Sequence, residues 1–222
     1  GAVSGVATRQ LAKEGAANLA ILGSGTQAVI HIESMMAVRP IRNIRVWSRN
    51  WDHAVSFADR QTRYFGLPIE AAHSALEAIQ DADIICTTTW ATEPILEGNW
   101  LSPGTHINAI GSSSPAYREI DSNAVVRSRF YVDQREAVMA QATDFRAPKE
   151  EALISDDHIR GELGELLLGK ADGRESDDDI TLFKAVGLAV ADLAAANFVY
   201  ERAMKEKIGT WIDFGGERLT PY

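Results

Sequence analysis

Two glycines near the N-terminus have the spacing of a phosphate-binding turn. The segment 19–28 reads LAILGSGTQA, an apolar run followed by Gly23, Gly25 and the start of a helical pattern. It matches G-x-G-x-x-G/A, in which the first glycine permits a tight turn and the second lets a pyrophosphate approach the backbone. Glycines also close ordinary turns, but the strand before and the helix after supply the context that this motif requires. The residues expected to bind a dinucleotide pyrophosphate are Gly23, Gly25, Thr26 and Gln27.

The residues after the second expected strand, 44–47, indicate which dinucleotide binds. An NAD site usually has Asp or Glu at this strand end, where the carboxylate binds the ribose 2′-hydroxyl. This chain has Ser48, Arg49 and Asn50 there. A guanidinium can hold a 2′-phosphate through two parallel hydrogen bonds, whereas a carboxylate would repel it. We therefore expect these three residues to bind the 2′-phosphate of NADP; the alternative is that Arg49 is a surface residue and Asp52 binds the ribose of NAD.

Strands and helices alternate along the chain around these residues. The expected strands are 18–22, 44–47, 69–71, 83–88, 106–110, 130–132 and 180–183. The expected helices are 4–15 with Ser4 as N-cap, 26–38, 52–66 with Asp52 as N-cap, 74–79 and 185–207. This alternation predicts an α/β fold of the Rossmann type, a doubly wound parallel sheet that binds ligands at the carboxyl ends of its strands. Thr87, Thr88 and Thr89 follow one of those strands.

The C-terminal part of the chain is expected to belong to a second domain. The helix 185–207 is apolar on most faces as far as Tyr200, so it must pack against something extensive. Asp192 and Asn197 interrupt the apolar run, which favours a buried helix over a membrane span. We expect a Rossmann domain over 1–184 and, over 185–222, this helix with a strand within 208–214. A symmetric homodimer is the commonest way to cover such a surface.

Composition excludes several function classes. With 22 Lys and Arg against 31 Asp and Glu, the chain has a net charge of −9 and is a poor candidate for binding nucleic acid or an anionic membrane. Its one cysteine, Cys86, lies in an apolar run, which favours a buried inert thiol, a chain without internal disulfides and a cytoplasmic location. The five histidines, of which His31 and His106 are expected to be structural, show no metal-ligand spacing, so no metal site is expected.

Longer motifs resemble the ornithine cyclodeaminase/mu-crystallin family. The matching segments are 2–8, 22–28, 91–96, 103–111, 162–165 and 181–187. The resemblance implies a Rossmann domain beside a dimerisation and substrate domain, which is built from an N-terminal region together with the C-terminal helix and last strand. It also implies that an N-terminal region, with the family's substrate-binding arginine and active-site lysine, is absent from this chain.

The resemblance also implies an activity. Family members use NAD(P) to act on a carbon that bears an amino or imino group. The cyclodeaminases and alanine dehydrogenases have an Asp two residues before a proline, where this chain has Ser113 before Pro115, as the ketimine reductases have serine. We therefore expect an NADPH-dependent reductase of cyclic imino acids, which transfers hydride to the C=N carbon.

The roles expected in that reductase divide between cofactor and substrate. Thr88, Ile110 and Gly111 are expected to line the nicotinamide side, and Ser113 with Glu162 or Glu165 to face the substrate. Serine cannot act as a base unaided, but it can form a hydrogen bond with an imine nitrogen or a carboxylate. The alternatives are an NAD-dependent cyclodeaminase or amino-acid dehydrogenase, a Ser113 that only shapes its loop, and a non-catalytic ligand-binding protein.

Overall fold

The structure is a computed structural model that describes residues 1–112 and 114–212. It divides into two compact units, one covering Gly1–Gly187 and the other beginning at Leu188, and each is described by itself. The expected boundary after residue 184 stays a prediction about domains of the whole protein. Ser113 and the end of the expected C-terminal strand, from residue 213, lie outside the described residues.

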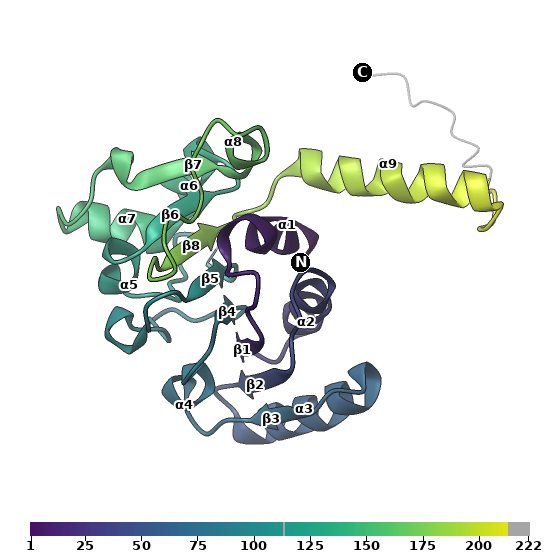
Figure 1. Cartoon of the computed structure of the whole chain (residues 1–222), viewed down its shortest axis with the longest axis horizontal. Coiled ribbons are helices and arrows are strands. Elements are labelled where there is room, and N and C mark those ends of the chain that lie inside the picture. Colours follow the sequence, from purple (N-terminus) through teal and green to yellow (C-terminus); the bar gives the residue numbers. More distant parts are fainter. Residues whose placement is uncertain (113, 213–222) are drawn as a thin grey trace, which may run out of the picture. The chain divides into compact units, whose positions relative to one another are not determined.

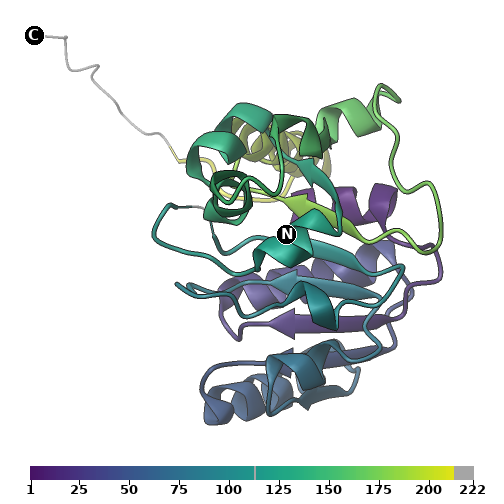
Figure 2. The same ribbon diagram turned by 90° about the vertical axis from the view of Figure 1, so that its left-hand side faces the viewer.

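A single parallel sheet forms the centre of the first unit (Figures 1 and 2). Within the described residues it has eight strands in the order β3-β2-β1-β4-β5-β8-β6-β7, and every neighbouring pair is parallel. The strands are β1 (Asn18–Leu22), β2 (Asn43–Trp47), β3 (Ile69–Ala71), β4 (Ile84–Thr87), β5 (His106–Ala109), β6 (Arg129–Val132), β7 (Ile159–Glu162) and β8 (Thr181–Lys184). The order reverses between β1 and β4, and doubly wound sheets bind ligands at such a switch point. The expected α/β fold is confirmed.

Helices cover both faces of the sheet. One face packs against α1 (Ala2–Leu11), α2 (Thr26–Val38), α3 (Trp51–Phe65) and α8 (Leu163–Leu167). The other packs against α4 (Ala75–Ile79), α5 (Ser122–Val126), α6 (Arg135–Gln141) and α7 (Thr143–Glu150). Short 3-10 turns, η1 (Gly98–Trp100) and η2 (Asp156–His158), lie in the connections. Strand β1 shows why its sequence is apolar throughout: Leu19 and Ile21 face one layer of helices and Ala20 and Leu22 the other.

Two expected helix caps were wrong. Ser4 lies inside α1, where its hydroxyl is hydrogen-bonded to Nε2 of His31 on α2 at 2.9 Å. The N-cap of α3 is Asn50, whose side-chain oxygen accepts the N–H of His53, and Asp52 lies in the first turn. Helix α1 thus begins before Ser4, with Gly1 as an N-cap that has no side-chain cap, whereas α3 is capped locally by the polar residue two positions before the expected one.

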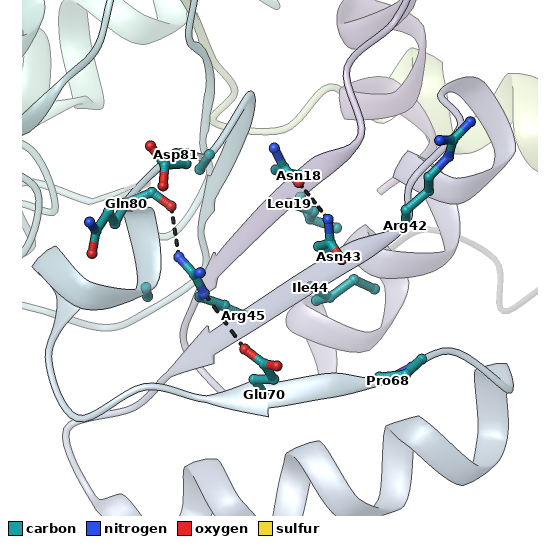
Figure 3. A pocket seen from close by; sticks show the side chains of 12 residues that line it. Asn18, Leu19, Arg42, Asn43, Ile44, Arg45, Pro68, Glu70, Gln80 and Asp81 are labelled. Carbon is teal, nitrogen blue, oxygen red and sulfur yellow. Dashed lines mark hydrogen bonds and ion pairs between the residues drawn. The ribbon is translucent and has the colours of Figure 1, made fainter.

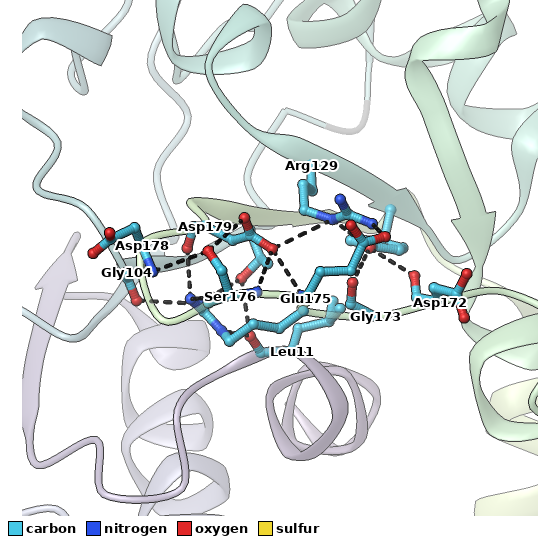
Figure 4. A network of polar contacts seen from close by, with 12 residues as sticks. Leu11, Gly104, Arg129, Asp172, Gly173, Glu175, Ser176, Asp178 and Asp179 are labelled. Atoms are coloured by element: carbon cyan, nitrogen blue, oxygen red, sulfur yellow. Dashed lines mark hydrogen bonds and ion pairs between the residues drawn. The ribbon is translucent and has the colours of Figure 1, made fainter.

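The segment between α8 and β8 ties α1 to the sheet (Figure 4). Arg174 donates hydrogen bonds to the backbone carbonyl oxygens of Leu11, Gly104 and Asp179 at 2.8, 3.1 and 2.6 Å. Nearby, the Arg129 guanidinium pairs with Glu175. Because these carbonyls belong to the end of α1, the turn before β5 and the segment itself, one side chain fixes three parts of the fold.

The second unit contains α9 (Ala189–Glu206). It starts four residues later than the sequence predicted, since Ala185–Leu188 is not helical. None of its residues is buried within this chain, and its exposed large apolar residues are Val190, Leu193, Phe198, Val199, Tyr200 and Met204. Residues 208–212, the described part of the expected last strand, do not form a strand. In the part of the chain that the structure describes, no helix is long and apolar enough to cross a membrane.

Candidate functional site

The turn between β1 and α2 has the features that an anion needs. Gly25 is the N-cap of α2, whose first turn has neither a side-chain cap nor an acidic residue. Gly25, Thr26 and Gln27 are exposed. A Cβ built on Gly25 would meet no atom within 4 Å, so the space over the turn is open. Free N–H groups and the positive end of the helix dipole therefore face solvent at the carboxyl end of β1.

Gly23 has a different task from Gly25, because it lies against Thr88. Its φ is +122°, and its N–H donates to the carbonyl oxygen of Trp47 at 2.8 Å. A Cβ at Gly23 would lie 2.7 Å from both the carbonyl oxygen and Oγ1 of Thr88. The Thr88 N–H and hydroxyl both donate to the carbonyl oxygen of Leu22, at 2.8 and 3.2 Å. The ends of β1 and β4 are thus joined at the switch point, and only glycine fits there.

The three residues expected to bind the 2′-phosphate follow β2 directly. Arg49 and Asn50 are exposed and Ser48 is half-buried. Asn50 already accepts a hydrogen bond as the N-cap of α3. Arg49 forms no ion pair with the residues that the structure describes, so its guanidinium is free to meet a ligand at the carboxyl edge of the sheet.

A buried carboxylate that the sequence analysis missed organises the ends of β4 and β5. Glu119, completely buried, accepts hydrogen bonds on Oε2 from the Thr87 hydroxyl (2.6 Å) and the Gly111 N–H (2.7 Å). On Oε1 it accepts from the N–H (2.5 Å) and hydroxyl (2.7 Å) of Thr89. The run Thr87-Thr88-Thr89 at the end of a strand was a local signal, because it places several hydroxyl donors at one point of the sheet edge. No local pattern identifies Glu119 as their partner, because it lies at least 30 residues further along the chain from Thr87 and Thr89.

Two further buried charges accompany Glu119. The ammonium of Lys184 lies 3.0 Å from Oδ2 of Asp144, and both side chains are completely buried. This contact is an ion pair without hydrogen-bond geometry. Asp144 Oδ1 accepts the N–H groups of Glu119 and Ile120 at 3.0 and 3.2 Å. Burial raises the pKa of Glu119, while the Lys184 charge and the hydroxyl donors act in the opposite direction.

The candidate substrate carboxylates lie apart from the cofactor residues. Glu162 ends β7, and it forms a capping box with Glu165 at the start of α8. Glu162 also accepts the N–H of Arg135 at 2.7 Å. Strands β8 and β6 separate β7 from β5, and with strands about 4.8 Å apart this spacing is about 14 Å. The structure thus brings the cofactor candidates together and gives Glu162 and Glu165 a helix-capping role at one edge of the sheet.

The remaining candidates lie after β5. Ile110 donates its N–H to the carbonyl oxygen of Thr87 at 3.1 Å, and Gly111 is held by Glu119. Both are half-buried, next to the segment that contains Thr88. Ser112 is buried and donates to the carbonyl oxygen of Tyr117 at 2.5 Å. The candidate Ser113 lies outside the described residues, and its role stays a prediction.

Three residues set aside as structural are confirmed as core residues. His31 and His106 are completely buried, and burial lowers their pKa values to about 4 and about 3. Cys86 is buried as well, and desolvation raises its pKa to about 12, so the thiol stays protonated and inert.

A separate cavity lies at the opposite edge of the sheet (Figure 3). Its volume is about 410 Å³, and its lining includes Asn18 and Asn43, the first residues of β1 and β2. Arg45 in its wall already binds Glu70 and the carbonyl oxygen of Gln80. Because ligands of doubly wound sheets bind at the carboxyl ends of the strands, this cavity lies away from the edge where a dinucleotide is expected.

The model of the ornithine cyclodeaminase/mu-crystallin family matches residues 1–207 of the chain. The chain belongs to this family. Among curated family members, it is 40% identical over 215 residues to the Delta(1)-pyrroline-2-carboxylate reductase of Bacillus cereus, covering 96% of this chain and 66% of that protein. It is 38% identical over 200 residues to the ketimine reductase mu-crystallin of Mus musculus, covering 90% and 60%. The chain therefore spans just under two thirds of the length of these relatives.

A solved structure of a Delta(1)-pyrroline-2-carboxylate reductase has the same fold as this chain. The Delta(1)-pyrroline-2-carboxylate reductase of Thermococcus litoralis, in complex with NADH and L-proline, is 38% identical and superimposes with a TM-score of 0.90. The match covers 94% of this chain and 65% of that protein. The resemblance to the family that the sequence motifs indicated is thus confirmed.

Proposed function

We propose that this chain is the dinucleotide-binding part of an NAD(P)H-dependent reductase of cyclic imino acids. The observation that carries the proposal is the open, uncapped start of α2 after Gly23 and Gly25, at the switch point of a parallel sheet. The substrate class is supported by relatives named as reductases of pyrroline-2-carboxylate and of ketimines, one of them in complex with NADH and L-proline.

In this proposal each turn of the carboxyl edge holds one part of the dinucleotide. The N–H groups of Gly25, Thr26 and Gln27 bind the pyrophosphate, because an exposed helix start attracts an anion. Arg49, with Ser48 and Asn50, binds the 2′-phosphate and so favours NADP over NAD. Its exposure and lack of an ionic partner among the described residues support this choice.

The nicotinamide would lie against the segments after β4 and β5, which contain Thr88, Ile110 and Gly111. When bound, the dinucleotide supplies the hydride that reduces the C=N bond. The part of this chain is to position the ring and to exclude water from it. Ser113 and one of Glu162 and Glu165 are proposed to face the substrate. The two glutamates cap α8, so the acid–base role needs a movement of that helix or a residue outside this chain.

The second unit is proposed to take part in a homodimer. The exposed apolar residues of α9 need a cover, and a twofold interface is the commonest way to supply one. In this proposal residues 185–222 belong to the dimerisation and substrate domain, which the family resemblance completes with an N-terminal region. Light scattering by the full-length protein measures the assembly, and a protein that stays monomeric at high concentration would contradict it.

A substrate screen tests the proposed function. The full-length protein is incubated with NADPH or NADH and pyrroline-2-carboxylate or piperideine-2-carboxylate, and with NAD and ornithine or alanine. We expect NADPH oxidation with a cyclic imine. Ammonia release from ornithine would instead identify a cyclodeaminase, and alanine-dependent NAD reduction an amino-acid dehydrogenase. Binding of the dinucleotide without turnover of any of the four would indicate a ligand-binding protein.

A further inference from the structure

We propose that Glu119 is a positioning residue for the nicotinamide half of the dinucleotide, an inference that rests on the proposed function. Its carboxylate joins the segment after β4 to the segment after β5. These are the two segments against which the nicotinamide is proposed to lie. Glu119 itself is completely buried, so it acts through Thr89 and Gly111 and does not touch the ligand.

Each carboxylate oxygen of Glu119 accepts a backbone N–H from one of the two segments. Oε1 accepts the backbone N–H of Thr89 at 2.5 Å, and Oε2 accepts the backbone N–H of Gly111 at 2.7 Å. A hydroxyl can reverse its role from donor to acceptor, but a backbone N–H can only donate. An amide in place of the carboxylate would therefore turn its NH₂ group toward one of the two N–H groups, whichever way it is oriented. We call the Glu119 carboxylate with the N–H groups of Thr89 and Gly111 the joint. The joint requires two acceptor oxygens, which only a carboxylate supplies.

The fit around this joint is close. A Cβ built on Gly111 would overlap the carbonyl oxygen of Thr89 and would lie 2.5 Å from Oε1 of Glu119. Residue 111 must therefore be glycine for the two segments to meet. The position of Glu119 is fixed in turn by Asp144, which accepts its N–H at 3.0 Å and pairs with Lys184 at the end of β8. The joint is thus anchored to α7 and β8 behind it.

The pyrophosphate turn has its own support, independent of Glu119. Thr88 is held by Leu22 through its N–H and its hydroxyl, and it is this residue that packs against Gly23. Loss of the carboxylate would release Thr89 and Gly111 but leave the contact between Thr88 and Gly23 in place. The effect on binding should accordingly be confined to the nicotinamide end of the dinucleotide.

The test compares ligands with and without the nicotinamide ring. Glu119→Gln and wild-type full-length protein are titrated with NADPH and with 2′-phospho-ADP-ribose, which lacks the ring. We expect Glu119→Gln to bind NADPH roughly 10-fold or more weakly than wild type, which corresponds to the loss of one hydrogen bond to a charged group. Its affinity for 2′-phospho-ADP-ribose should stay within about twofold of wild type. The kcat for imine reduction should fall in the same variant.

Asp121→Asn is the matched control. Asp121 is also a carboxylate that accepts two backbone N–H groups, from Gly98 and Ala124, but both bonds are to the single oxygen Oδ1. An amide oxygen can replace that atom, so this variant should bind both ligands like wild type. Thr87→Val is a second test variant, because it removes one hydroxyl donor to Glu119 while keeping the side-chain shape. Thr87→Val should weaken the binding of NADPH, but not of 2′-phospho-ADP-ribose, by a smaller factor than Glu119→Gln does. It replaces Glu119→Gln as the test variant if that protein does not fold.

The outcomes separate this inference from the proposed function. A wild-type protein that binds neither NADPH nor NADH contradicts the proposed function and the role of Glu119 with it. If wild type binds NADPH, equal affinities of the variants and wild type overturn the inference alone. An equal loss of affinity for both ligands also overturns it, because that result would show a general structural role.

Discussion

A side chain at Gly23 would collide with Thr88, since a Cβ there would lie 2.7 Å from the Thr88 carbonyl oxygen. The φ of +122° at Gly23 adds a second obstacle to any other residue. Gly23→Ala is therefore expected to lower the free energy of unfolding by roughly 1–3 kcal/mol. Denaturant unfolding measures the change. Gly15→Ala, at a glycine with open space, is the control and should change stability by about 0.5 kcal/mol or less. Equal stability of the two variants would contradict the role given to Gly23.

A substitution at Gly25 should affect cofactor binding and leave stability nearly unchanged. A Cβ there meets nothing in the protein, so Gly25→Val is expected to fold with nearly unchanged stability. Its branched side chain would fill the space over the start of α2, and affinity for NADPH should fall by at least about tenfold, or 1.4 kcal/mol. Isothermal titration measures the affinity. Unchanged affinity in the folded variant would contradict the assignment of the pyrophosphate site.

Arg49 should decide between the two dinucleotides. A charge-assisted hydrogen bond contributes about 1.5–3 kcal/mol, so Arg49→Ala should weaken NADPH binding by roughly 10- to 100-fold while NADH binding changes little. Arg60→Ala, which removes an exposed arginine further along α3, is the control. A wild-type preference for NADH would refute the proposed choice of NADP.

His31 should make the protein sensitive to acid. Its pKa is lowered in the folded state from 6.5 to about 4, chiefly by desolvation, so between these values the unfolded chain binds the extra proton. The contribution of His31 to the free energy of unfolding is fully present above pH 6.5. It is lost as the pH falls toward 4, and the loss is at most about 3 kcal/mol. Denaturant unfolding at several pH values should give a flatter profile for His31→Gln than for wild type. A flat wild-type profile, or a His31→Gln profile as steep as that of wild type, would contradict the prediction.

The turns proposed to bind the cofactor could be located in the fold from the sequence because their signals are local. Gly23, Gly25 and Arg49 stand directly between an apolar strand and a helix, and the structure has both elements where they were expected. Glu119 could not be found in this way. A glutamate beside Arg118 looks like a surface residue, and only the folded sheet brings it to Thr87 and Thr89. A different limit, helix length, applies to α5, α6, α7 and α8: they have five to eight residues each, too few for a helical period to show clearly.

The product of the reaction tests the central claim most directly. The full-length protein is incubated with pyrroline-2-carboxylate and NADPH in which both hydrogens at C4 of the nicotinamide are replaced by deuterium, and the product is analysed by mass spectrometry and NMR. The account predicts proline with deuterium on its α-carbon, and no ammonia when ornithine and NAD replace these substrates. Proline without deuterium, or rapid ammonia release from ornithine, would contradict the assignment as a reductase of cyclic imino acids.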